Sequence, residues 1–334
     1  DGKCDYCAFY SIPFEPDLAD RWLAALEMEM LRCQYPEPIE PDTVFIGGGT
    51  PTLLGPERIG RLCSILRRLF PLRQNGEWSI EANPGTLTRD TLETLVAAGV
   101  NRLSLGAQAF DDRVLLRLGR RHSAADIPRA FQMARESGFR NLGLDLIACV
   151  PGVGPRTWRR TLDQAIALGP EHVSVYALTF EEGTRLCARR DPARLRAKTD
   201  VAQLADLRQA ETVLRQAGYC RYEISNYARP GFECRHNMAC WRGDDYLGFG
   251  PAAASCADLL RWTNAPDLAA YLSALEAGCD PPRELHKLTP TRRAEERMIF
   301  GLRMTEGVPL AVAAGFTGKL EQLREHRLVE QKAG

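Results

Sequence analysis

The feature that most constrains the fold of this chain is a repeated alternation between short β-branched runs and longer amphipathic runs, from Pro16 to about Gly183. Apolar residues in the longer runs recur at helical spacing, whereas the short runs have the length and composition of buried strands. This order predicts an α/β fold with a parallel sheet covered by helices. The predicted strands are 43–46, 78–81, 102–105, 143–147 and 172–176, and the predicted helices are 17–34, 56–70, 88–98, 124–138 and 156–168.

Polar residues and glycines at the ends of these strands favour a barrel over an open, doubly wound sheet. The first strand closes on the glycines 47–49, and the second ends on Glu81. Gln108 follows the third strand, and Asp145 lies within the fourth. In a barrel the carboxyl ends of the strands meet at one mouth. Because a polar side chain in a buried strand costs free energy without a partner, its repetition on several strands predicts a ligand site there.

The length of the chain and the change of pattern after Gly183 predict more than one structural unit. The 334 residues of the chain exceed the roughly 250 to 300 residues that one core usually serves. We expect a partial (β/α)6 barrel over residues 1–182 and an extension over 183–265, whose later part is irregular. A smaller, mainly helical domain is expected over 266–334.

Both ends of the sequence are abrupt. Asp1 directly precedes the densest motif, and the last residues, Lys332 to Gly334, do not end a recognisable element. We therefore expect the first barrel strand to lie upstream and the C-terminal domain to continue downstream.

Charge and cysteine usage narrow the partners and the compartment. Lys plus Arg and Asp plus Glu both total 43, so no basic stripe favours a nucleic-acid partner. The apolar stretches are shorter than the roughly 18 residues needed for a membrane span. Eleven cysteines at irregular spacing are typical of a reducing compartment, where thiols stay free or bind metal. These features predict a cytoplasmic protein.

Two local motifs are informative but ambiguous when they are considered alone. Cys4 and Cys7 form a Cys-x-x-Cys pair, which zinc ribbons, redox dithiols and iron-sulfur sites all use. The glycines 47–49 let backbone groups approach a ligand closely, although a plain glycine turn has the same composition.

Taken together, the motifs resemble the oxygen-independent coproporphyrinogen III oxidase family of radical S-adenosylmethionine (SAM) proteins. The resemblance rests on CDYCAFYS at 4–11, FIGGGTPT at 45–52, SIEANP at 79–84, the stretch 101–110 and DLI at 145–147. The later motifs YEISNYARPG at 222–231, CRHN at 234–237, WRG at 241–243 and YLG at 246–248 are similar to its heme chaperone branch.

The resemblance implies a [4Fe-4S] cluster and SAM at the barrel mouth. Cys4 and Cys7 match two of three cluster cysteines, and the family spacing places the third directly before Asp1. Three thiolates leave one iron open to SAM, and the reduced cluster can pass an electron to the sulfonium. The positions that match the SAM pocket are Gly48, Gly49 and Thr50 beside the methionyl part, Glu81, Gln108, Arg120 and Asp145 along the pocket, and Ile147 and Ala177 near the adenine.

His236 is the candidate heme ligand among the five histidines, because Cys234, Cys240 and Trp241 surround it in a segment expected to be irregular. Imidazole and thiolate both bind heme iron axially, and tryptophan offers a flat apolar face to a porphyrin. The chaperone branch carries His-Asn-x-x-Tyr-Trp here, whereas this chain has Cys240 in place of the tyrosine. A zinc site from Cys234, His236 and Cys240 is an alternative, with a spacing that matches no common finger.

Three functions remain open from the sequence. The resemblance implies a protein that binds heme and transfers it to apo-proteins. The alternative is oxidative decarboxylation of coproporphyrinogen III, for which the family decarboxylases have a further cysteine at the position of Phe9. A barrel that binds zinc or acts as a dithiol through Cys4 and Cys7 is the third.

Overall fold

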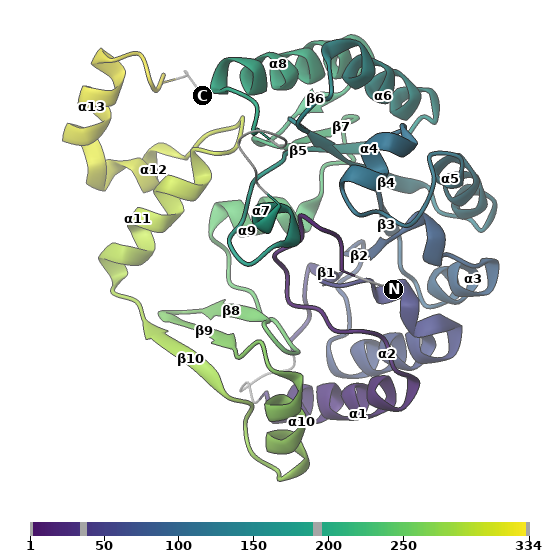
Figure 1. Cartoon of the computed structure of the whole chain (residues 1–334). Helices are drawn as coiled ribbons and strands as arrows, with labels where there is room; N and C mark the ends of the chain where they lie inside the picture. Colours follow the sequence, from purple (N-terminus) through teal and green to yellow (C-terminus); the bar gives the residue numbers. More distant parts are fainter. Residues whose placement is uncertain (1–2, 34–38, 190–195, 332–334) are drawn as a thin grey trace.

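The computed structural model describes residues 3–33, 39–189 and 196–331, so both abrupt ends of the sequence lie outside the described residues. Its main sheet has the order β1-β2-β3-β4-β5-β7-β6 and curves around a polar interior (Figure 1). The first five strands are parallel, β7 runs antiparallel to β5, and β6 pairs antiparallel with β7. The strands are β1 (Thr43–Ile46), β2 (Glu77–Ala82), β3 (Arg102–Gln108), β4 (Asn141–Ala148), β5 (His172–Ala177), β6 (Cys220–Arg221) and β7 (Asn226–Ala228).

Helices cover the outer face of this sheet, and the five strands and five helices predicted up to residue 183 are confirmed. Thr88 and Thr199 cap two helices by accepting hydrogen bonds from backbone N–H groups two or three residues into the helix. The helices are α1 (Pro16–Arg32), α2 (Gly55–Leu69), α3 (Arg89–Ala97), α4 (Asp112–Arg117), α5 (Asp126–Glu136), α6 (Pro155–Ala167), α7 (Arg185–Ala188) and α8 (Asp200–Gln216).

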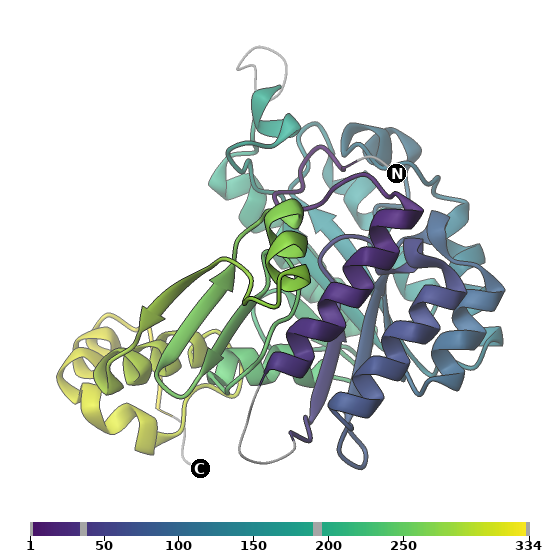
Figure 2. The ribbon, with the colours of Figure 1, turned by 90° about the horizontal axis from the view of Figure 1, so that it is seen from below.

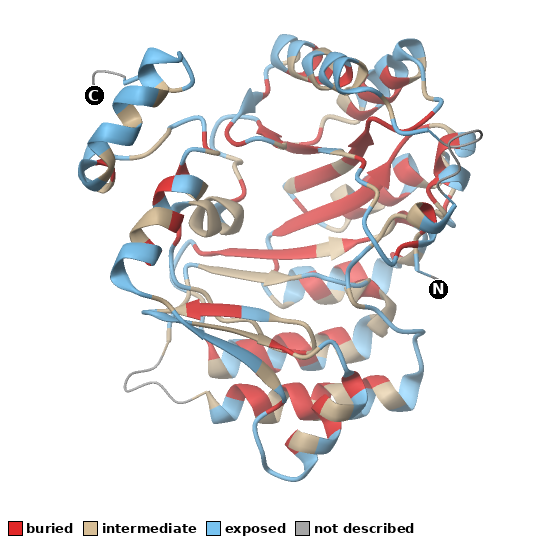
Figure 3. Cartoon of the chain, turned by 60° about the vertical axis from the view of Figure 1, so that its left-hand side comes forward, coloured by how far each residue is buried: buried red, intermediate tan, exposed pale blue. Residues whose placement is uncertain are grey.

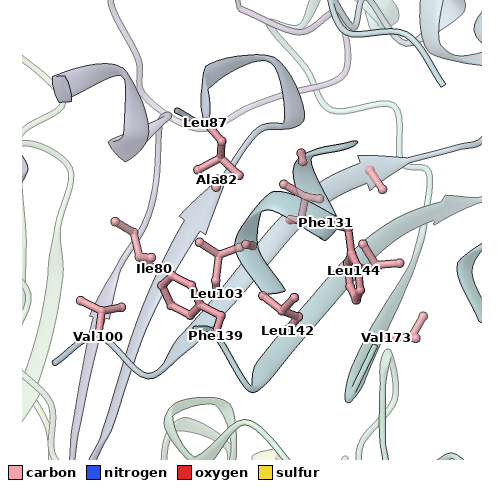
Figure 4. Packing of buried hydrophobic residues seen from close by; sticks show 14 of the residues in the cluster. Ile80, Ala82, Leu87, Val100, Leu103, Phe131, Phe139, Leu142, Leu144 and Val173 are labelled. Atoms are coloured by element: carbon pink, nitrogen blue, oxygen red, sulfur yellow. The ribbon is translucent and has the colours of Figure 1, made fainter. Parts of the chain in front are cut away.

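The hydrophobic core lies between the sheet and these helices. Ile80, Leu103, Leu142 and Leu144 project from neighbouring strands and pack with Phe131 of α5 (Figure 4). Burial agrees with this arrangement, because the strands are buried and the outward faces of the helices are exposed (Figure 3). Because side chains alternate across a strand, the residues between these apolar ones point to the interior of the curved sheet. That interior contains serine, arginine and carboxylate side chains.

The rest of the chain contacts both edges of the sheet, with helix 235–242 against β1 and Thr305 N donating to Tyr222 O at 2.9 Å beside β6. Helix α10 (Leu268–Glu276) lies along α1 (Figure 2). The carboxylate of Glu29 on α1 is buried and accepts hydrogen bonds from Tyr271 Oη at 2.6 Å, Asn264 Nδ2 at 2.7 Å and the Gly250 backbone N at 2.8 Å. The remaining helices are α11 (Pro290–Gly301), α12 (Leu310–Ala313) and α13 (Thr317–Glu325). No helix among the described residues has the length and apolar character needed to cross a membrane.

The expectation that the later part of 183–265 is irregular was wrong. The stretch around His236 is not irregular but forms helix α9 (Arg235–Arg242), and residues beyond it form a three-stranded antiparallel sheet. That sheet pairs β8 (Ala254–Ala257), β9 (Leu260–Asn264) and β10 (Arg283–Lys287). Local sequence signals are weak here, because the turn between β8 and β9 has Asp258, with φ of 54°, where glycine is usual. Strand β10 is almost wholly exposed, so it lacks an apolar alternation.

Candidate cofactor site and a second cavity

The loop that carries Cys4 and Cys7 is held over the carboxyl ends of the parallel strands by Asp5. The Asp5 backbone N donates to Leu118 O at 3.2 Å, and its carbonyl accepts from Leu186 N at 2.7 Å. Its buried carboxylate forms an ion pair with Arg189. The loop is therefore fixed to the end of α4 on one side and to α7 on the other.

Arg120 connects this loop to the strand ends. Its Nη1 lies 3.4 Å from Cys4 Sγ, and its Nη2 donates to Gly106 O at 2.8 Å and to Asn83 Oδ1. Arg120 is thus a partly buried mouth residue rather than a solvated arginine at a helix end. N–H donors to sulfur are among the groups that tune an iron-sulfur cluster, so this donor set fits one. Among the described residues no three potential metal ligands gather, so the role of Cys4 and Cys7 as two of the cluster ligands stays a prediction.

Glu81 closes one side of the mouth. Its Oε2 accepts a hydrogen bond from the Gly48 backbone N at 3.0 Å. Burial, with a further contribution from the charge of Asp145, raises the pKa of the Glu81 carboxyl to about 7. A Cβ at Gly47 would lie 2.6 Å from the Phe45 ring and 2.9 Å from the Glu81 carboxyl, so only glycine fits there.

The other predicted SAM-pocket residues line the same mouth. Asp145 accepts from Ser104 Oγ at 3.1 Å, and burial raises the pKa of its carboxyl. Thr50 Oγ1 accepts from Asn83 Nδ2 at 2.9 Å. Gln108 ends β3 after a register shift and has φ of 64°, a strained value that turns the chain into the mouth. The structure also brings Gly49, Ile147 and Ala177 to the ends of β1, β4 and β5.

We predict opposite effects of Glu81→Gln on stability and on SAM binding. A folded-state pKa near 7, above that of the unfolded chain, means that stability is lost as pH rises through about 7. The neutral variant should therefore melt at a higher temperature than the parent at about pH 8 and lose this pH dependence. It should also bind SAM about tenfold more weakly, because the cationic cofactor loses a charged acceptor. Thermal melts and calorimetric titrations against pH test this, with the exposed Glu57→Gln as control.

The interior below the mouth holds a buried arginine that the sequence analysis missed. Arg102 at the start of β3 is 2% exposed, and its Nε has no hydrogen-bond partner. His172 Nδ1 and Asn226 Oδ1, also buried, likewise have none. The negative charge of Glu77 is among those that raise the Arg102 pKa. A charged residue that opens a strand and alternates with leucines, as in 102–105, is the signal that could have revealed it.

Helix α9 is capped by a carboxylate from the sheet. Its N-cap residue, Cys234, makes no side-chain cap hydrogen bond. Instead, Glu77 at the start of β2 accepts from the backbone N of Arg235 at 3.0 Å and of His236 at 3.2 Å. The Cys234 Sγ also lies 3.5 Å from a Glu77 oxygen. A carboxylate at a helix N-terminus is favourable for the unpaired N–H groups and the helix dipole, so Glu77 fixes where α9 begins.

His236 is oriented by β1. Its Nδ1 is hydrogen-bonded to Thr43 Oγ1 at 3.2 Å, and its ring stacks on Phe45 with centroids 4.8 Å apart. Its Nε2 lies 3.9 Å from Cys240 Sγ, one turn along α9. Burial lowers the pKa of His236, so the imidazole is neutral near pH 7.

A cavity of about 430 Å³ opens beside this imidazole. It is lined by His236, Cys240 and Trp241 of α9, with Phe300 of α11 and Arg261 of β9 among the other walls. Trp241 is held by Phe300, whose ring centroid lies 6.3 Å away. The cavity reaches β1 at Phe45, and Gly48 follows three residues later in the chain. At about 3.3 Å per residue the two sites lie on the order of 10 Å apart along the strand.

Comparisons with known proteins give the class and the family of this chain. Residues 1–165 match the model of the Radical SAM superfamily. The heme chaperone HemW of Bacillus subtilis (strain 168) is 35% identical over 308 residues, covering 91% of this chain and 81% of that protein. HemW of Mycobacterium tuberculosis (strain CDC 1551 / Oshkosh) is 36% identical over 312 residues, covering 93% and 80%. The structure of coproporphyrinogen III oxidase (HemN) from Escherichia coli has a TM-score of 0.82 and 27% identity, covering 96% and 79%.

The curved parallel sheet, the cysteine loop and the match over residues 1–165 define a radical SAM protein. Membership of that class implies a [4Fe-4S] cluster and SAM as cofactors. Within this class, the sequence identity over most of both chains identifies the family. The chain belongs to the heme chaperone HemW family.

Proposed function

We propose that this chain is a radical SAM heme chaperone that binds heme in the cavity beside α9 and transfers it to apo-proteins. The observation that carries the proposal is the arrangement of His236, whose Nδ1 is held by Thr43 while the ring lines the cavity with Trp241. A neutral imidazole is a good axial ligand for heme iron, and the aromatic walls suit a porphyrin face. Arg261 and Arg293 also line the cavity, where they are paired with Glu296 and Asp245, so their positive charge adds to the field that propionate carboxylates would meet.

The mouth residues support a separate site for the cluster and SAM. Cys4 and Cys7, with a third thiolate, would hold a [4Fe-4S] cluster, which supplies an electron to the SAM sulfonium when it is bound. Glu81 and Asp145 would accept hydrogen bonds from the ammonium and hydroxyl groups of SAM. Arg120 would donate to the Cys4 thiolate, and Ile147 would contribute an apolar contact near the adenine.

Decarboxylation of coproporphyrinogen III is the second candidate, favoured only by the structural similarity to HemN. Phe9 argues against it, because the resemblance puts a cysteine at that position in decarboxylases. Here the side chain is a 71% exposed phenyl ring. Incubating the reconstituted protein with coproporphyrinogen III and SAM should release no carbon dioxide, whereas release would favour this function.

We predict that His236→Ala weakens the binding of ferrous heme by at least about tenfold, because the imidazole ligand is lost. Iron-sulfur content and SAM affinity should stay unchanged, since those belong to the mouth. Heme titrations of the reduced protein followed in the Soret region measure the loss, with the exposed His326→Ala as control. Transfer of heme to apomyoglobin tests delivery. A chain that takes up no heme would rule this function out.

A further inference from the structure

Two side chains that can bind heme iron face the cavity from consecutive turns of α9. His236 and Cys240 are four residues apart, and this spacing places them on one face of the helix. The distance from His236 Nε2 to Cys240 Sγ is 3.9 Å. Because Thr43 occupies Nδ1, a ligand of the imidazole must bind Nε2, in place of its hydrogen bond with the Cys240 thiol.

The geometry allows either donor to reach the same iron, but not both at once. Bonds from a metal to imidazole nitrogen and to thiolate sulfur are about 2.0 and 2.3 Å long, so an iron placed before either atom is near the other. The porphyrin fills the four equatorial positions of the iron. A porphyrin placed between two donors of one helix would collide with the backbone of α9, so the two donors compete for one axial position.

We propose that heme held in this cavity exchanges its axial ligand with the oxidation state of the iron, Cys240 binding ferric heme and His236 binding ferrous heme. This inference rests on the proposed function. In the exchange, a one-electron donor reduces iron(III) to iron(II), and the bond from iron to the Cys240 sulfur breaks. The released thiolate takes up one proton to become a thiol, and the Nε2 lone pair of His236 forms the new bond. Oxidation reverses each change.

The charges of the donors explain the direction of the exchange. An anionic thiolate stabilises ferric iron more than ferrous iron, because ferric iron has the larger positive charge. A neutral imidazole discriminates less between the two oxidation states. Cys240 must lose a proton to bind, and burial together with the charge of Asp244 raises the pKa of its thiol. The other charged or titratable groups around the two donors are Glu77 on β2, Arg102 on β3, Tyr246 after α9, Arg261 on β9 and Arg293 on α11.

Other soft donors of the segment are not placed for this role. Cys234 is fully buried, and its Sγ contacts Glu77 rather than the cavity. Burial also raises the pKa of the Cys234 thiol to about 12. Met238 does not line the cavity. The exchange therefore depends on the single position at which this chain has cysteine and the resembled motif has tyrosine.

The test compares the full protein with Cys240→Ser, His236→Ala and the exposed control Cys220→Ser, each titrated with hemin and then reduced with dithionite. Electron paramagnetic resonance and magnetic circular dichroism identify thiolate ligation in the ferric state. Cys240→Ser should lose that signature and bind ferric heme about tenfold more weakly, with ferrous affinity within about twofold of the parent. A selective tenfold loss raises the heme midpoint potential by about 59 mV. His236→Ala should show the reverse pattern.

A second measurement needs no substitution at the site. Ferric heme, which binds the Cys240 sulfur, should protect Cys240 of the unmodified protein from alkylation more strongly than ferrous heme, which only covers it, as read by mass spectrometry with Cys220 and Cys279 as exposed references. Heme bound with an imidazole signature in both states, and unaffected by Cys240→Ser, would overturn the exchange while leaving the proposed function intact. Absence of heme binding by the parent would remove both.

Discussion

Replacing Cys7 by serine, in a chain that carries the third cluster cysteine, is expected to abolish cluster assembly. A serine oxygen is a poor ligand for a cluster built on thiolates, and the remaining thiolates hold it weakly. After anaerobic reconstitution with iron and sulfide, iron per chain should fall to near background. The brown absorbance at about 400 nm that the parent shows should be lost with it. Formation of deoxyadenosine from SAM should stop.

The exposed Cys220→Ser is the matched control, since it removes a thiol of the same chain far from the mouth. It should retain parental iron content. Stoichiometric zinc in the parent, with no iron-sulfur absorbance, would instead support the zinc or dithiol interpretation of Cys4 and Cys7. The cysteine expected directly before Asp1 gives a further comparison, because its replacement should reproduce the Cys7→Ser result.

The barrel could be predicted from the sequence because its signals are local. Each predicted strand is a short run with apolar residues either consecutive or alternating, and each predicted helix has apolar residues at helical spacing. Glu81, Gln108 and Asp145 could also be recognised, since a polar residue near the end of a buried strand has few structural explanations. Arg120 required the family resemblance, because nothing near it in the sequence reveals its contact with Cys4, 116 positions away.

The surroundings of His236 could not be predicted, because the contacts that form them are distant in sequence. Thr43 and Phe45, which orient the imidazole, precede it by about 190 positions. Helix α9 begins with no cap from its own sequence, and its missing acceptor is Glu77, more than 150 positions upstream. Local helix propensity does not depend on such a distant partner, so the sequence alone predicts an irregular segment here.

Phe45 gives the two sites a shared wall. Its ring stacks on the His236 ring and also lies beside Gly47. Gly47 in turn lies so close to the Glu81 carboxyl that no side chain fits there. The candidate heme ligand and the SAM pocket are thus separated along β1 by a single aromatic side chain. Substitutions at Phe45 should consequently be assessed for effects on both sites.

Glu77→Ala is expected to lower the free energy of unfolding by about 3–5 kcal/mol, the range for leaving a buried charge uncompensated. The variant loses the acceptor for the N–H groups of Arg235 and His236, and it leaves the guanidinium of Arg102 with less compensating charge. It should also lose heme binding, because α9 no longer begins at a fixed point. Urea unfolding and heme titration measure the two effects.

Adding Arg102→Met to Glu77→Ala separates these two causes. Removing both charges eliminates the uncompensated cation, so much of the lost stability should return, as in other buried pairs replaced by apolar groups. Heme binding should not return, since the cap of α9 is still missing. Glu211→Ala, which breaks an exposed ion pair with Arg221 at 3.5 Å, is the control and should cost less than about 1 kcal/mol. Recovery of heme binding together with stability would show that Glu77 acts on His236 only through the overall fold, and not as the cap that positions it.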